Sequence, residues 1–143
     1  MSLDNFLSSL YVNVNGDLLS VSLEHKKLEK ALIDHVTSKG FEIKCSSSHG
    51  LKTCDAVDDV IPDVRAYNSK EKLTLYGEAE TADSIDTDHT KNQIKVLANR
   101  KMTKSEKSCP FYLAVPKGSK ATAQKVIKDI GYDKKTNIYI VEF

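Results

Sequence analysis

Strand-like and helix-like hydrophobic patterns succeed one another along this chain, and their order limits the fold more than any other feature. Periods of about 3.6 residues indicate helices, and periods of two indicate strands. The predicted elements are a helix over 22–39, strands over 41–47, 60–68 and 72–81, a helix over 86–100, a strand over 111–117, a helix over 118–131 and a strand over 137–143. Strands that alternate with helices in this way predict an α/β fold, with a mixed central sheet flanked by helices.

The length of 143 residues suits one compact domain, with a core over 20–143 and an N-terminal extension over 1–19. The formal net charge of +1 neither indicates nor excludes a polyanionic partner. Any phosphate contact is therefore expected from local groups of Lys and Arg. No basic segment followed by an apolar run begins the chain, and nowhere do about 18 apolar residues run together. A protein that is neither secreted nor inserted in a membrane is expected.

Three cysteines, Cys45, Cys54 and Cys109, make an odd number in a chain without a secretion signal. This count favours reduced, mostly structural thiols over a disulfide framework, and a cytoplasmic location. A stand-alone domain of this size suits a microbe, a mobile element or a virus in its host cell. Zinc binding is an alternative, because Cys45, His49 and Cys54 are suitable donors and Cys109 is a distant fourth. Their spacing is not that of a standard zinc-binding pair, so the structural role is the expected one.

Acidic side chains gather on the predicted strand over 72–81. Side chains alternate along a strand, so Glu78 and Glu80 point to one face. If the strand before it pairs with it through the short polar turn, Asp63 comes level with Glu78. Like charges this close are destabilising unless a cation neutralises them, and a hard divalent ion with oxygen ligands is the usual solution. The residues therefore predict a Mg²⁺ site, with Mn²⁺ as an alternative ion.

The first predicted helix adds a further carboxylate. Its apolar stripe runs through Leu28, Leu32 and Val36 at four-residue spacing. Stepping back one turn along the stripe reaches Glu24, so Glu24 is expected to approach the other acidic groups.

The sequence IPDVRAYNSKEKLTLYGEAET, residues 61–81, resembles the core of the PD-(D/E)XK nuclease superfamily. It contains a Pro-Asp pair, a hairpin of ordinary length and two acidic residues separated by one. The resemblance covers roughly 20–143 and implies a restriction-endonuclease-like αβββαβ core. It implies Asp63 and Glu78 as metal ligands, and it puts Glu80 where the superfamily usually has lysine. Some restriction endonucleases of the superfamily carry this Glu-x-Glu form, and compact Holliday-junction resolvases share the size of this chain.

The same resemblance implies roles for the flanking residues. Glu80 is expected to be a third ligand or a general base; alternatively, Lys91 or another nearby lysine replaces the missing ammonium group. Many members carry an acidic residue on the first helix, matched here by Glu24, and a glutamine on the helix after the acidic strand. Gln93 matches that glutamine and is expected to orient water or substrate.

DNA contacts are expected from the basic residues of two helices. On the first helix these are His25 and Lys27, and on the second they are Lys91 and Lys95. The alternative for each is a solvated helix face. A homodimer fits the need for two sites to cut a duplex or a branched junction.

The sequence thus predicts a metal-dependent DNA endonuclease that hydrolyses phosphodiester bonds through a carboxylate-bound Mg²⁺. The main alternative is a catalytically inactive nuclease-like fold that binds nucleic acid or a protein, with the change from lysine to Glu80 marking the loss of catalysis. A third interpretation is an α/β domain whose acidic strand is incidental.

Overall fold

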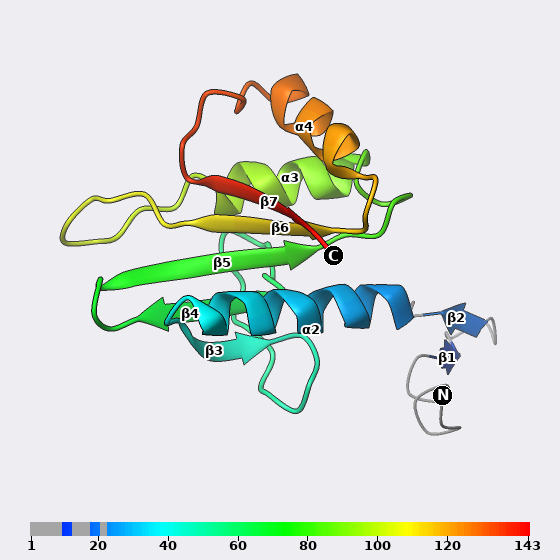
Figure 1. Cartoon of the computed structure of the whole chain (residues 1–143), viewed down its shortest axis with the longest axis horizontal. Coiled ribbons are helices and arrows are strands. Elements are labelled where there is room, and N and C mark those ends of the chain that lie inside the picture. The colour runs from blue at the N-terminus through cyan, green and yellow to red at the C-terminus, as the bar shows by residue number, and fades with distance from the viewer. Residues whose placement is uncertain (1–9, 13–17, 21–22) are drawn as a thin grey trace.

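A five-stranded mixed sheet with helices on both faces forms the centre of the protein (Figure 1). The structure is a computed structural model and describes residues 10–12, 18–20 and 23–143. Its elements beyond the N-terminal region are α2 (Leu23–Ser38), β3 (Glu42–Ser46), β4 (Val64–Asn68), β5 (Leu73–Ala79), α3 (Asp88–Leu97), β6 (Phe111–Val115), α4 (Lys120–Asp129) and β7 (Ile138–Glu142). The predicted order of helices and strands and the α/β class are confirmed.

The strand order is β3-β4-β5-β6-β7, and the sheet changes from antiparallel to parallel at β5. Strands β3, β4 and β5 pair antiparallel, because only a short turn separates β4 from β5. Strands β5, β6 and β7 pair parallel, because α3 and α4 carry the chain back between them. The predicted hairpin of β4 and β5 is thus confirmed, and β5 lies at the centre of the sheet.

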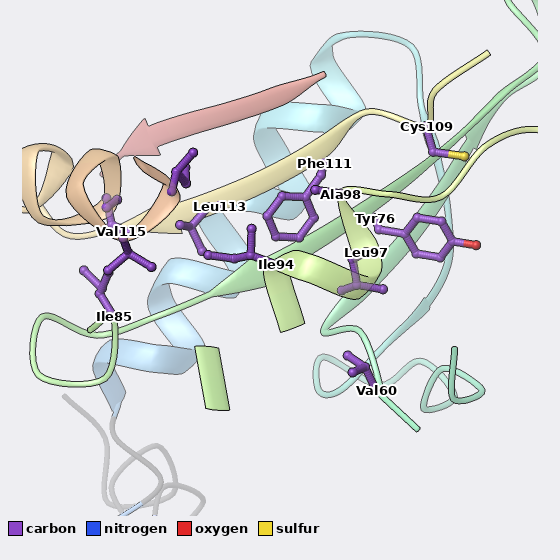
Figure 2. Packing of buried hydrophobic residues seen from close by; sticks show 13 residues of the cluster. Val60, Tyr76, Ile85, Ile94, Leu97, Ala98, Cys109, Phe111, Leu113 and Val115 are labelled. Atoms are coloured by element: carbon purple, nitrogen blue, oxygen red, sulfur yellow. The ribbon is translucent and has the colours of Figure 1, made fainter. Parts of the chain in front are cut away.

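Helix α2 covers one face of the sheet, and α3 and α4 cover the other (Figure 1). The core under α2 is built from Leu28, Leu32, Val36, Phe41, Val64, Ala66, Leu75, Ala79, Tyr112 and Ala114. The core on the other face includes Tyr76, Ile85, Ile94, Leu97, Phe111, Leu113 and Val115 (Figure 2). Side chains of β5 alternate between these two cores, as the two-residue period predicts.

Gly77 lets α2 approach β5 closely. A Cβ atom at this position would lie 2.8 Å from Leu32 Cδ2, and Leu32 is fully buried. The missing side chain therefore sets the distance between helix and sheet.

Within the predicted extension, β1 (Leu10–Val12) and β2 (Leu18–Ser20) pair antiparallel. The other residues of 1–19 lie outside the described part of the chain. No helix in the described residues is long and apolar enough to cross a membrane.

The expectation of three reduced thiols is wrong for two of them. Cys45, in β3, forms a disulfide with Cys54, and their Cα atoms are 5.0 Å apart. The intervening loop turns back at His49 and Gly50, which have φ angles of 64° and 76°. Cys109 is free and buried. The pairing removes both thiols from the alternative zinc site, and it removes the cysteine argument for a cytoplasmic location.

Candidate functional site

The hairpin of β4 and β5 brings the two central carboxyl groups together. Val64 pairs with Gly77, so the preceding residue, Asp63, comes level with Glu78 as predicted. The Ala79 backbone N–H donates a hydrogen bond of 2.9 Å to Asp63 Oδ2. Asp63 is thereby fixed across the end of β5.

Glu78 and Glu80 are both buried, with 1% and 7% of their surface exposed. Burial, and then the charge of Asp63, raise the pKa of Glu78 well above its ordinary value. Burial also raises the pKa of Glu80, although the Ser84 hydroxyl opposes this by donating a hydrogen bond of 2.6 Å to Glu80 Oε2. Glu78 Oε1 is buried and has no hydrogen-bond partner. Such an oxygen is costly unless a proton or a cation reaches it.

Helix α2 contributes Glu29 to this cluster, and the prediction of Glu24 in that role is wrong. Glu24 is exposed, whereas Glu29 is fully buried. A helix turns about 100° per residue, so positions spaced by four drift around its axis. Glu24 therefore lies about 120° away from the direction of Val36, whereas Glu29 and His25 each lie within about 20° of it. Stepping back from the partly buried Ile33 would have found both residues.

The loop closed by the disulfide holds Glu29 in place. Ser47 Oγ lies 2.5 Å from Glu29 Oε1 and 3.2 Å from Asp63 Oδ1, so it links two carboxyl groups. The Ser47 backbone N–H and the Ser48 hydroxyl also donate to Glu29, and His49 Nε2 lies 3.5 Å from Glu29 Oε2. Burial raises the pKa of Glu29, and the Ser47 hydrogen bond opposes the shift. No sequence pattern predicted this network.

His25 is the basic partner of the cluster. Its Nε2 lies 3.2 Å from Asp63 Oδ2. The hydrogen bond to Asp63 raises the pKa of His25, burial lowers it, and the negative charges of Asp63, Glu29 and Glu80 raise it further. Burial opposes ionisation of Asp63, but hydrogen bonds from His25 and Glu78 outweigh it, so the pKa of Asp63 lies below its ordinary value. Asp63 is therefore a carboxylate, and Glu78 is the group that holds a proton beside it.

The remaining predicted residues are less closely connected to the cluster. Gln93 is buried in α3, and its Oε1 has no hydrogen-bond partner. Lys91 Nζ lies 3.4 Å from Asp86 Oδ1 and forms an ion pair there. Lys27 and Lys95 lie on α2 and α3, and both are exposed. The basic side chain that contacts Asp63 is instead the His25 imidazole.

The donor chemistry of the cluster fits a hard divalent cation, although its arrangement is not that of a finished metal site. Only carboxyl oxygens are offered, by Asp63, Glu78, Glu80 and Glu29, and Glu78 Oε1 has no hydrogen-bond partner that would compete with a cation. Among the described residues, no three or more His, Cys, Asp or Glu side chains stand in an arrangement that could hold a metal ion. A cation would have to displace the proton of Glu78 and draw the carboxylates inward.

Comparisons with protein families, with curated proteins and with solved structures find no match to this chain. Its function therefore has to be inferred from the residues of the site.

Proposed function

We propose that this chain is a metal-dependent nuclease of the PD-(D/E)XK type that hydrolyses phosphodiester bonds in DNA. The observation that carries the proposal is the convergence of Asp63, Glu78, Glu80 and Glu29, with one buried oxygen of Glu78 left without a partner. The order of α2, the strands β3 to β5, α3 and β6 further supports a restriction-endonuclease-like αβββαβ core.

In this proposal Asp63, Glu78 and Glu80 hold Mg²⁺, and Glu29 contributes negative charge beside them. Bound there, the ion would polarise the scissile phosphate and lower the pKa of an attacking water. Glu78 must give up its proton to take part, since a protonated carboxyl is a poor metal ligand. The cluster thus trades a proton for a divalent cation.

His25 takes the place of the superfamily's lysine in this proposal. Its imidazole Nε2 lies 3.2 Å from Asp63 Oδ2, and a protonated ring there would place a positive charge facing a phosphate oxygen or a leaving group. The Ser47 hydroxyl holds Asp63 and Glu29 at fixed positions. Lys91 is not needed for this role, because it pairs with Asp86.

A second candidate function is a nuclease-like fold that binds nucleic acid without cutting it. Two observations favour it: Glu80 stands in place of lysine, and the described residues contain no finished metal-binding group. Metal binding and cleavage, measured separately, distinguish the two candidates.

The test is nicking of supercoiled plasmid and of a branched DNA panel with Mg²⁺, Mn²⁺ or EDTA. The parent is compared with Asp63→Asn and with Asp83→Asn, a matched control on an exposed residue. Loss of a metal ligand is expected to reduce cleavage on the order of 100-fold or more. Asp83→Asn is expected to cut like the parent.

The outcomes separate the candidates clearly. Metal-dependent nicking that disappears in Asp63→Asn supports the nuclease. Binding of DNA without nicking under any metal condition supports the binding module. Nicking that survives EDTA, or that Asp63→Asn leaves unchanged, contradicts the proposed site.

A further inference from the structure

A hollow of about 630 Å³ lies beside β7, and it contains none of the carboxyl cluster. Its lining comes from the end of α2, from α4 and the turn that follows it, and from β6 and β7, and it includes Tyr112 and Tyr139. Strand β7 is the last strand of the described sheet, so the hollow follows an open sheet edge (Figure 1).

The charge of this hollow is one-sided. Four lysines line it, Lys39, Lys120, Lys128 and Lys135, against one acidic residue, Asp133. Glu142, at the end of β7, is engaged elsewhere, because its Oε2 accepts hydrogen bonds of 2.9 and 3.0 Å from the Gly118 and Lys120 backbone N–H groups. The positive side chains therefore act on an occupant of the hollow with little opposition, and they select a polyanion.

An aromatic stack reaches this edge from the interior. Tyr112 and Tyr139 occupy paired positions on β6 and β7, and their rings are stacked with centroids 4.8 Å apart. Tyr112 is buried, whereas Tyr139 is 45% exposed. Packing against Tyr112 holds the Tyr139 ring in one orientation, so an exposed aromatic surface is offered at low entropic cost.

We propose that the hollow beside β7 binds a single strand of nucleic acid, with one base stacked on Tyr139 and its phosphates held by the surrounding lysines. Exposed aromatic rings beside lysines are the means by which proteins hold single strands, because every base has a flat apolar face. A duplex hides these faces within its stack. Self-association at β7 is disfavoured, because an isologous contact would bring the same lysines together.

This inference does not depend on cleavage, and it goes beyond the proposed nuclease site. If both are correct, the hollow adds a second contact for substrates with an unpaired strand.

The test is fluorescence anisotropy of labelled oligo(dT) and oligo(U) of about 12 nucleotides, a length within the range of known single-strand sites. The protein is the full chain carrying Glu78→Gln, in EDTA, so that cleavage cannot interfere. Tyr139→Leu removes the stacking surface and keeps an apolar residue on the strand. Lys128→Glu reverses a charge on the exposed side of α4 and keeps the test informative if the tyrosine variant folds poorly. The matched controls are Tyr67→Leu and Lys104→Glu, which lie outside the hollow.

Tyr139→Leu is expected to weaken oligonucleotide binding by about 5- to 100-fold, the range that loss of one stacked base produces. Lys128→Glu is expected to weaken binding and to reduce its dependence on salt, because fewer counterions are released. Both control variants are expected to bind like the parent.

Three results overturn the inference: no binding at low salt, equal losses in the control variants, or a dimer in sedimentation that Tyr139→Leu dissociates. Preferred binding of an acidic peptide to the same surface also overturns it. Oligonucleotide binding without plasmid nicking would leave this inference standing and refute the nuclease alone. Plasmid nicking without oligonucleotide binding would refute this inference and leave the nuclease standing.

Discussion

Replacing Glu78 by glutamine should stabilise this protein at neutral pH and should abolish binding of a divalent cation at the proposed site. The carboxyl group of Glu78 is 1% exposed, and its Oε1 has no partner. Keeping this buried carboxyl protonated lowers the stability once the pH exceeds its unfolded pKa, by up to about 1.4 kcal/mol for each unit by which the folded pKa is raised. Glutamine has the same shape, carries no charge, and can donate an amide N–H to the Asp63 carboxylate. Glutamine has no proton to lose, so we expect the free energy of unfolding to rise by about 1–3 kcal/mol at neutral pH in EDTA.

The pH dependence gives this prediction its sign. The pKa of Glu78 is raised in the folded protein above its ordinary value of 4.5. Below that value the group is protonated in both the folded and the unfolded state, so its full contribution to stability is present. As the pH rises towards the folded pKa, the unfolded chain loses the proton first, and the stability of the parent falls. The advantage of Glu78→Gln is thus small near about pH 4 and grows towards about pH 7.5.

Thermal unfolding in EDTA at both pH values measures this difference. For a chain of this size, about 1–3 kcal/mol corresponds to a rise in Tm of roughly 2–10 °C. Glu71→Gln, on the exposed turn between β4 and β5, is the matched control and is expected to change little. Excess Mg²⁺ should stabilise the parent, by about 2.7 kcal/mol at 100 times the Kd, and should not stabilise Glu78→Gln. A variant that is less stable at neutral pH, or equally shifted at both pH values, would refute the reasoning.

Three further predictions follow from the same region. Cys45→Ser should lower the free energy of unfolding by about 2–3 kcal/mol, because the short loop ending at Cys54 is no longer closed. Denaturant unfolding with and without reductant measures the loss, and an unchanged midpoint contradicts the prediction. Gly77→Ala should lower the free energy of unfolding by about 1–3 kcal/mol, because the added Cβ would lie 2.8 Å from Leu32 Cδ2. Chemical denaturation tests this, and a variant more stable than the parent would show that α2 can move away from β5 without cost. Affinity for Mg²⁺ should rise with pH above about 5, because raised pKa values keep Glu29, Glu78 and Glu80 protonated in acid. Calorimetry in two buffers with different ionisation enthalpies should detect the release of protons on binding. An affinity that does not change with pH would argue against these ligands.

Much of the fold could be predicted from the sequence because local signals and tertiary packing agree. The period of two in β5 places alternate side chains in different cores, and the short turn before it leaves β4 only an antiparallel partner. The position of Asp63 level with Glu78 follows from the length of that turn and the alternation of the strands. Where strand pairing determines a contact, the contact can be predicted from the spacing of the residues along the sequence.

The rest of the site depends on the direction in which each side chain leaves α2 and on the closure of the loop between Cys45 and Cys54. Spacing along the sequence describes both poorly. Steps of four along α2 led to Glu24, because the drift of a helix around its axis accumulates over three turns. The spacing of Cys45, His49 and Cys54 resembled a set of metal donors. The turn at His49 instead returns the chain to β3 and brings the two sulfur atoms together. The exposed stack of Tyr139 on Tyr112 requires two distant strands to be neighbours in register.

The hairpin of β4 and β5 also has a consequence for how the chain folds. It places Asp63 and Glu78 together through local pairing, whereas His25 arrives only when α2 docks from a distant part of the sequence. Contacts between residues close in sequence form earlier than distant ones. The two carboxyl groups therefore meet before the cation that balances them is present, and at neutral pH their repulsion opposes the hairpin. Protons, and divalent ions at the proposed site, should accelerate folding at this step, so assembly of the sheet is expected to be sensitive to both.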